Sequence, residues 1–118
     1  MSLLSSSISE QIFQIDPLIR FVGIYRNNEL YCSYRKDIKP YIDEKKTTQS
    51  LKQASKRWKE RKELLSSGIG DPIYSVTMYG LVKRIVMELK DGSIILLSTE
   101  HEVDHEKLLL KLMDFRDL

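Results

Sequence analysis

The sequence predicts an α+β fold, a sandwich in which helices pack on a five-stranded antiparallel sheet. Three observations support this prediction. Hydrophobic residues recur at helical spacing near both ends and in the middle of the chain, whereas strand-like patterns fill the segments between. A hairpin-like pair of strand segments precedes the long middle helix, and three strand segments follow it. The last two strand segments are apolar on both faces, as expected for central strands that are covered on both sides. The predicted order is therefore α-β-β-α-β-β-β-α.

Length and composition indicate one globular domain. The 118 residues fit a single domain over 1–118, of which we expect residues 1–6 to be flexible. Hydrophobic residues make up 42% and charged residues 31%, which favours a folded protein over a disordered one. Cys32 is the single cysteine, so no intrachain disulfide can form, and a reducing cytoplasm is the expected location. No apolar run approaches the roughly 18 residues that a membrane-spanning helix needs.

The first predicted helix begins at Ser7, which lies three residues before Glu10 in a capping-box arrangement. Apolar side chains then recur at helical spacing as far as Ile15. Asp16-Pro17 ends the helix, because the residue before a proline avoids helical backbone angles.

A β-hairpin is predicted next. Residues 18–26 and 30–35 are rich in β-branched and aromatic side chains, and Asn27-Asn28 between them suits a tight turn because asparagine tolerates positive φ. Cys32 lies in the second strand, and we interpret it as a small buried hydrophobe rather than a reactive thiol.

The longest predicted helix covers residues 48–65, after a charged connection that contains Pro40. Its apolar face is predicted to consist of Leu51, Ala54, Trp58 and Leu65. Gly68, Gly70 and the following proline predict where the helix stops. A basic surface is predicted on the other faces, formed by Lys52, Lys56, Arg57, Lys59, Arg61 and Lys62.

Three strands and a final helix complete the predicted order. Residues 73–79 alternate in polarity, and residues 81–89 and 93–98 flank Lys90-Asp91-Gly92, a strong hairpin signal. The final helix is predicted over residues 103–115.

The segment His101-Glu102-Val103-Asp104-His105 matches the zinc-peptidase pattern H-E-x-x-H. That chemistry requires both histidines on one face of a continuous helix and a third protein ligand from elsewhere. Here the segment joins a strand to a helix, and Asp104 is a natural N-cap, which places His101 outside the helix. If Thr99 were the cap instead, the histidines would align, but no histidine or cysteine follows position 105. We therefore predict no metal site and interpret both histidines as solvated residues beside a helix cap.

Motifs for other chemistry are missing from the sequence. It contains no phosphate-binding glycine loop with a Lys-Ser or Lys-Thr ending, no G-x-S-x-G and no C-x-x-C. Four acidic residues lie close to the first turn of the last helix, where they complement its dipole: Glu100, Glu102, Asp104 and Glu106. We predict no catalytic residues, no cofactor and no enzymatic activity.

With this element order, the chain resembles the roadblock/dynein-light-chain-7 domains of the profilin-like group over residues 7–115. The stretches IDPLIRFVGIYRNNELY and GIGDPIYSVTMYGLVKRIVMEL also resemble an archaeal family of small proteins. The roadblock resemblance implies a non-catalytic scaffold that forms dimers through its long helix and the following strand, and that serves as a platform for small GTPases. The sequence departs from many roadblock proteins in its lysine-rich long helix, which carries Trp58.

A homodimer is also predicted from the residues. An edge strand that presents apolar and aromatic side chains is prone to pair with another strand, and a two-fold contact between copies covers it most simply. If the 73–79 strand lies at the edge, the expected interface consists of Trp58, Tyr74, Val76, Met78 and Tyr79.

Two alternative functions follow from other features. Residues 26–63 hold twelve Lys or Arg against six Asp or Glu, and this local charge of +6 suits an anionic partner such as nucleic acid. Base-stacking aromatics are scarce among the basic residues, which disfavours sequence-specific readout. A small-molecule sensor is the other alternative, because profilin-like sheets can hold a ligand between sheet and helix. Its candidate polar residues are Ser33, Ser75 and Thr77.

Overall fold

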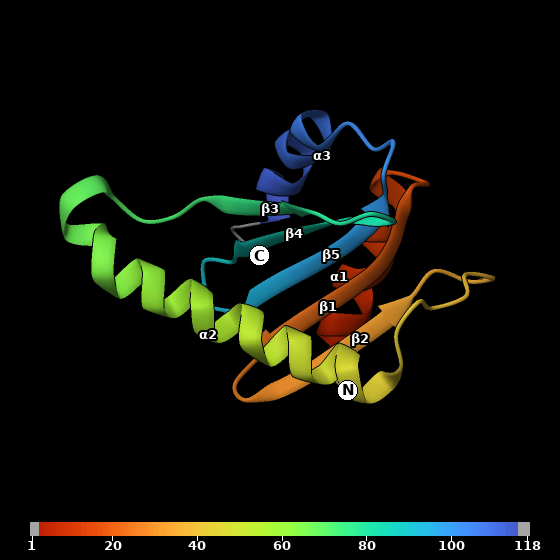
Figure 1. The fold of residues 1–118 in the computed structure, drawn as a ribbon, viewed down its shortest axis with the longest axis horizontal. Coiled ribbons are helices and arrows are strands. Elements are labelled where there is room, and N and C mark those ends of the chain that lie inside the picture. Colours follow the sequence, from red (N-terminus) through yellow and green to blue (C-terminus); the bar gives the residue numbers. More distant parts are fainter. Residues whose placement is uncertain (1–2, 116–118) are drawn as a thin grey trace.

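The computed structural model describes residues 3–115 and contains the predicted elements in the predicted order (Figure 1). Their bounds are α1 (Leu3–Ile15), β1 (Ile19–Arg26), β2 (Glu29–Tyr34), α2 (Glu44–Ile69), β3 (Tyr74–Met78), β4 (Val82–Glu88), β5 (Ile94–Glu100) and α3 (His105–Leu112), followed by a short 3-10 turn (Met113–Phe115). All paired strands are antiparallel, in the spatial order β2-β1-β5-β4-β3. No helix in this part of the chain is long and apolar enough to cross a membrane.

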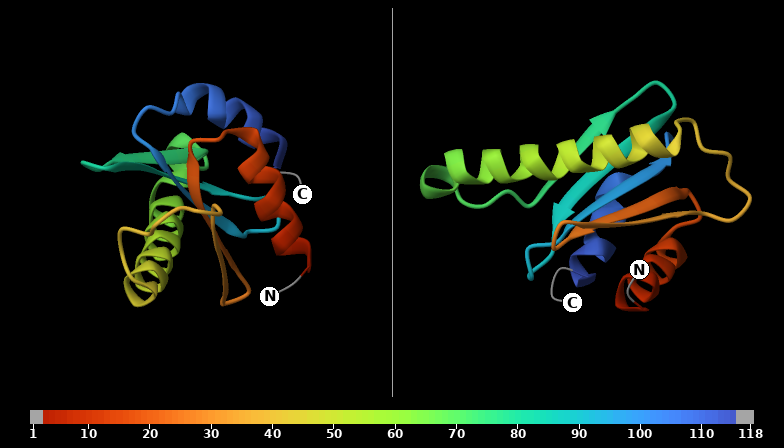
Figure 2. Two further views of the ribbon diagram at one scale, coloured as in Figure 1. Left: turned by 90° about the vertical axis from the view of Figure 1, so that its right-hand side faces the viewer. Right: turned by 90° about the horizontal axis from the view of Figure 1, so that it is seen from below.

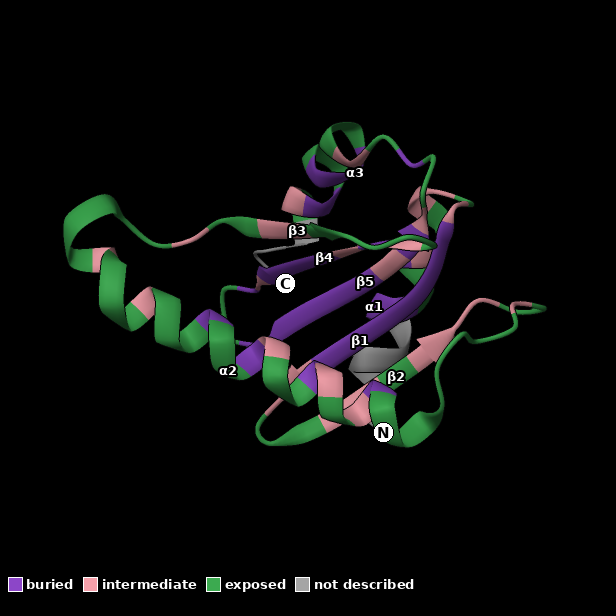
Figure 3. Cartoon of the chain, viewed as in Figure 1, coloured by how far each residue is buried: buried purple, intermediate pink, exposed green. Residues whose placement is uncertain are grey.

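The sheet forms the middle of three layers. Helices α1 and α3 cover one face, and α2 crosses the other face (Figures 1 and 2). Alternate residues of β4 and β5 therefore point into two different clusters: Ile85 and Leu97 face α1 and α3, whereas Val86 and Leu96 face α2. The prediction that these two strands are central and covered on both sides is confirmed, and Figure 3 shows them largely buried.

The β1–β2 turn has the predicted chemistry. Asn27 and Asn28 have φ angles of 52° and 64°, and the flanking residues Arg26 and Glu29 face each other across the hairpin. Positive φ at both central residues matches the right-handed twist of the two strands.

Helix α1 starts earlier than predicted, at Leu3, so Ser7 lies inside the helix rather than at its cap. Residues 1–2 of the segment that was expected to be flexible lie outside the described residues. At the other end of the helix, Arg35 donates hydrogen bonds to the carbonyl oxygens of Phe13 and Asp16, each at 2.7 Å. Arg35, which directly follows β2, thereby donates to carbonyl oxygens that have no hydrogen-bond partner within the helix.

Helix α2 is longer than predicted at both ends. Asp43 caps it by accepting a hydrogen bond from Lys46 N at 2.7 Å, and Gly70, with φ of 90°, ends it. The predicted inward position of Leu65 is wrong: this residue is 46% exposed. The last turns of α2 extend beyond the sheet, so no strand lies beneath them (Figure 1).

Cys32 is exposed, which corrects its predicted role as a buried hydrophobe. It lies on β2, an edge strand, beside the first turn of α2. Partial desolvation raises the pKa of the Cys32 thiol, and the nearby Glu44 carboxylate raises it further. The protonated thiol is therefore favoured even though the residue reaches solvent.

Candidate interaction surface

Strand β3 forms one edge of the sheet and, within residues 3–115, pairs with β4 alone. Its outer backbone groups therefore face away from the sheet. Tyr74, Met78 and the next residue Tyr79 are between 45% and 55% exposed, whereas Val76 is half-buried against the core under α3. An apolar, aromatic edge of this kind favours pairing with another strand.

The exposed apolar character continues from β3 into the neighbouring segments. Leu64 and Ile69, on the overhanging turns of α2, are 77% and 80% exposed, and Ile73 in the connection to β3 is 50% exposed. We name this the β3-side surface, and it consists of Leu64, Leu65, Ile69, Ile73, Tyr74, Met78, Tyr79 and Leu81. The last turns of α2, which we call the overhang, extend past the sheet (Figure 1). The apolar side chains of Leu64, Leu65 and Ile69 on these turns are therefore not covered by a strand of the same chain.

Trp58 does not belong to this surface. Its side chain is 2% exposed and packs inside the subunit between α2 and the sheet. The indole Nε1 donates a hydrogen bond to Glu88 Oε1 at 2.8 Å, and Lys62 Nζ lies 3.0 Å from the same carboxylate. The hydrogen bond with Glu88 raises the pKa of Lys62, and the negative charges of Glu88 and Asp71 raise it further. Trp58 is thus a core residue that anchors α2 to β4.

The six basic residues of α2 do not form one surface. Arg57 and Arg61 line the side of α2 that faces β3 and β4. Lys59 lies over the ring of Tyr25, on the other flank, with 5.7 Å between Nζ and the ring centroid. Lys62 is paired with Glu88, and the remaining two predicted residues, Lys52 and Lys56, are exposed. Helical geometry distributes these positions around the axis, so their closeness in sequence did not imply a shared patch.

A groove runs along the α2 face of the sheet, on the β3 side of the helix. It joins a hollow of about 370 Å³, beneath the 36–43 connection, to one of about 310 Å³ between α2 and β3. Ser50, Tyr79, Arg84 and Leu96 line both hollows. Among the described residues, four arginines and no Asp or Glu line the combined groove, which we name the arginine groove; the arginines are Arg20, Arg57, Arg61 and Arg84.

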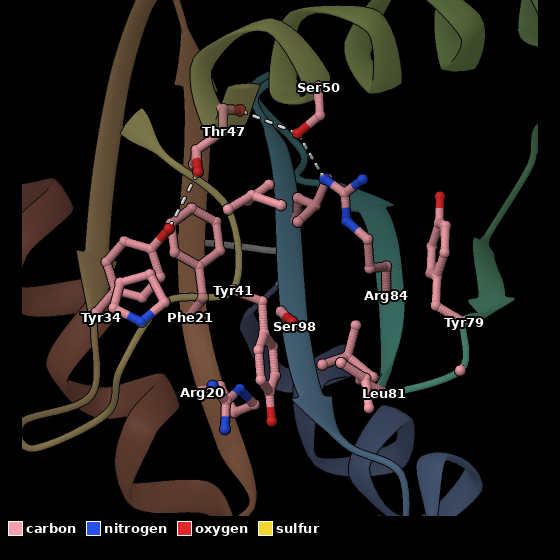
Figure 4. Close-up of a pocket in the computed structure, with 15 residues that line it drawn as sticks. Arg20, Phe21, Tyr34, Tyr41, Thr47, Ser50, Tyr79, Leu81, Arg84 and Ser98 are labelled. Carbon is pink, nitrogen blue, oxygen red and sulfur yellow. Dashed lines mark hydrogen bonds between the residues drawn. The ribbon is translucent and has the colours of Figure 1, made fainter. Parts of the chain in front are cut away.

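The hydroxyl residues proposed for a sensor site lie at different places. Ser75 and Thr77 line the hollow between α2 and β3, whereas Ser33 lies on β2 at the opposite edge of the sheet. Other polar residues line the larger hollow, among them Arg20, Tyr34, Thr47, Ser50, Arg84 and Ser98 (Figure 4).

The HEVDH segment has the geometry of a strand-to-helix junction. Asp104 caps α3 by accepting a hydrogen bond from Lys107 N, as predicted, and His101 lies before the helix. His101 Nε2 lies 2.7 Å from the Tyr79 carbonyl oxygen, and His105 Nδ1 lies 3.2 Å from Lys83 Nζ. Within the described residues, no group of three or more His, Cys, Asp or Glu side chains is placed to hold a metal ion.

The sequence did not predict several residues of the arginine groove and of the β3-side surface. Arg84 belongs to a strand predicted only as central, and Tyr41 to a segment predicted only as a connection. Leu64 and Ile69 lie near or beyond the predicted end of α2. The N-cap signal of Asp43, followed by helix-forming residues, was available in the sequence and would have lengthened the helix. Nothing in the local pattern indicated that Arg84 faces a hollow.

The layers, strand order and helix positions together define a roadblock/profilin-like α+β fold. Among solved structures, the gliding protein MglB from Thermus thermophilus superposes with a TM-score of 0.72 at 10% sequence identity, over 96% of this chain and 83% of that one. MglC from Myxococcus xanthus superposes with a TM-score of 0.55 at 9% identity, over 91% of this chain and 88% of that one. No protein-family model matches the sequence, and no curated protein matches it significantly. The likeness therefore establishes the fold.

Proposed function

We propose that this protein is a non-catalytic cytoplasmic scaffold that homodimerises through the β3-side surface and serves as a regulatory platform for a small GTPase. The observation that carries the proposal is the continuity of an open, apolar sheet edge with an overhanging apolar helix end. The roadblock-like fold adds support, because the resemblance implies dimers that act as GTPase platforms. A gliding protein is among the structures that share the fold.

The dimer is proposed to form by antiparallel pairing of β3 with β3 of a second copy about a two-fold axis. This pairing joins the two sheets and satisfies the outer backbone groups of both edges. The overhanging turns of α2 then gain apolar cover from the partner. The interface consists of Tyr74, Met78, Tyr79 and the overhang, with Val76 partly accessible, whereas the buried Trp58 supports it from inside the subunit.

The oligomeric state tests the first part of the proposal. Light scattering coupled to size-exclusion chromatography is expected to give a dimer for the full chain. Met78→Lys places a charge at the edge and is expected to give a monomer. Leu110→Lys is the matched control, because Leu110 is 75% exposed on α3 and is not part of the β3-side surface, so the dimer should stay intact. A wild-type monomer at high concentration, or a dimer that survives Met78→Lys unchanged, contradicts the proposed interface.

GTPase binding tests the second part. Purified small GTPases from the source organism, each loaded with GTP or GDP, are titrated with the chain while affinity and GTP hydrolysis are measured. Binding that depends on the nucleotide and weakens in Met78→Lys but not in Leu110→Lys is the expected result. If none of these GTPases binds in either nucleotide state, the proposed role as a GTPase platform is contradicted, even when the protein is a dimer.

A further inference from the structure

We propose that the larger hollow of the arginine groove is a binding site for a small amphipathic carboxylate. The apolar body of this ligand lies against Phe21, Tyr41 and Leu96, and its carboxylate binds Arg84. Tyr79 and Leu81 of the β3-side surface line one wall of this hollow, but the proposed ligand contacts come from other residues, and the site goes beyond the proposed scaffold function.

The hollow has the size and lining of a small-molecule site. Its volume of about 370 Å³ falls within the range of roughly 300–1,000 Å³ that is usual for ligand pockets. Phe21 from β1 and Leu96 from β5 line it from the sheet, and Tyr41 of the 36–43 connection also lines it, with its ring beside Arg20. Figure 4 shows Phe21, Tyr41 and Arg20. Such surfaces suit one aromatic ring or a short alkyl chain.

Arg20 holds the connection over the hollow. It donates a hydrogen bond to the Lys39 carbonyl oxygen at 2.9 Å, and its guanidinium carbon lies 4.3 Å from the centroid of the Tyr41 ring. The same guanidinium forms a salt bridge with Glu100. Its charge is therefore neutralised within the chain, and it acts as a support for the wall rather than as a free anion site.

Arg84 has a different environment. It is half-buried on β4, and its guanidinium Nη2 donates a hydrogen bond to Ser50 Oγ at 3.0 Å. Ser50 Oγ in turn donates to the Thr47 carbonyl oxygen at 3.0 Å, so the chain of bonds ends on helix α2 (Figure 4). No carboxylate of residues 3–115 forms a salt bridge with Arg84.

A partly buried guanidinium without a counter-charge favours an anion. Arginine carries five N–H donors in a planar fork, and a carboxylate accepts two of them in parallel. Among the described residues no acidic side chain lines the hollow, so no lining residue repels a carboxylate that enters it. The apolar floor excludes water from one side, which strengthens the resulting ion pair. One carboxylate and one apolar body are therefore the chemistry that this site matches.

Three acids and their uncharged amides test the proposal: indole-3-acetate, phenylpyruvate and octanoate against indole-3-acetamide, phenylpyruvamide and octanamide. Binding to the 15N-labelled full chain is followed by amide chemical shifts. At least one acid is expected to bind and to shift amides of Phe21, Tyr41 and Leu96. Its amide is expected to bind at least about tenfold more weakly, because hydrogen bonds to a charged partner are lost.

Two substitutions locate the carboxylate. Arg84→Gln is expected to weaken the acid at least about tenfold while the amide changes less than about twofold. Arg57→Gln is the matched control: Arg57 lines the neighbouring hollow and should leave both affinities within about twofold. Unchanged thermal unfolding and amide dispersion show that each variant is folded. Met78→Lys should bind the acid normally, so failure of the dimer and failure of this site are separable.

Three outcomes overturn the proposal. One is that no acid binds at concentrations up to about 10 mM, a weak limit for ligands of this size. Another is that the amides bind as tightly as the acids, which would show that no charged contact with Arg84 contributes to binding. The third is that Arg57→Gln weakens the acid as much as Arg84→Gln, which shows general attraction to basic charge.

Discussion

The two faces of the sheet differ in how completely they are covered. Among the described residues, the face under α1 and α3 buries fourteen apolar residues in one cluster, whereas the face under α2 buries six. The first face has two helices over it, and the second has one helix that crosses it and then runs past its end (Figure 1). The closed face therefore supplies most of the hydrophobic stabilisation, and the open face leaves the groove and the overhanging turns of α2 uncovered.

Helix α2 approaches the open face closely at Gly23 of β1. At Gly23 of β1, an added Cβ would lie 2.9 Å from Leu51 Cδ2 and 3.0 Å from the ring of Phe21. A residue without a side chain thus lets Leu51 of α2 sit directly on the sheet. On the β3 side of the helix, the arginine groove lies between α2 and the strands, and Trp58 ties α2 to Glu88 of β4.

The sharpest test of this comparison uses adjacent residues of β5. Leu97 faces α1 and α3, Leu96 faces α2, and each is 1% exposed. Leu97→Ala is expected to lower the unfolding free energy by about 4 kcal/mol and Leu96→Ala by about 2.5 kcal/mol. The smaller loss arises because Leu96 borders an existing hollow, into which its neighbours can relax. Denaturant unfolding measures both values, and equal losses would show that the two faces are packed alike.

Gly23→Ala probes the close contact of α2 with β1. The added methyl group forces Leu51 or Phe21 to move, so we expect a loss of about 2 kcal/mol in unfolding free energy. Gly80→Ala is a control, since an added Cβ there meets no atom within 4 Å. A loss at Gly80 as large as that at Gly23 would remove the steric explanation.

Glu88 tests the anchor between α2 and β4. Glu88→Gln keeps an acceptor for the Trp58 indole but loses the ion pair with Lys62, so the expected cost is at most about 1 kcal/mol. Glu88→Ala leaves the buried indole N–H without its partner and is expected to cost about 2 kcal/mol. Thermal unfolding of the two variants compares these values. Equal costs would assign the anchor to the ion pair rather than to the Trp58 hydrogen bond.

The smallest expected effect is a pH dependence at the β4–β5 turn. Partial burial acts to raise the pKa of Asp91, but hydrogen bonds from Ser93 and the charge of Arg26 outweigh it and hold the pKa below its usual value. A lowered folded-state pKa contributes stability above the usual pKa of aspartate, and this contribution is lost as the pH falls through the folded value. Asp91→Asn is therefore expected to be less stable than wild type at pH 7, with the difference closing in acid below about pH 4.

Unfolding of both proteins across this pH range measures the difference. Glu63→Gln, at an exposed position of α2, is the control and should show no such closure. A stability difference between Asp91→Asn and wild type that stays constant from pH 7 to pH 3 would contradict the assigned cause.

Much of the fold could be predicted because its signals are local. The Asn27-Asn28 turn, the Asp104 cap and the two-faced apolar pattern of β4 and β5 each depend on a few neighbouring residues. The length of α2 was underestimated because its first turn is charged and lacks apolar spacing, and because Gly68 and Gly70 predicted an earlier end than the structure has.

The candidate site was less predictable. The predicted dimer interface depended on the condition that the 73–79 strand lies at a sheet edge, and the structure has β3 at an edge. The predictions for Cys32, Leu65 and the basic residues of α2 depended on where α2 crosses the sheet and how far it overhangs. A hydrophobic pattern specifies which face of a helix is buried, but not over which strands or along what length.

The sequence by itself determined the elements, their order and the two turns, since backbone preference and hydrophobic spacing act over a few residues. The tertiary structure alone decided that Trp58 is internal, that Arg20 has a carboxylate partner and that Arg84 has none among the described residues. The partner of a long charged side chain depends on contacts between residues far apart in sequence, such as Arg20 and Glu100 or Arg84 and Ser50. Those contacts exist only once the crossing position of α2 and the path of the 36–43 connection are fixed.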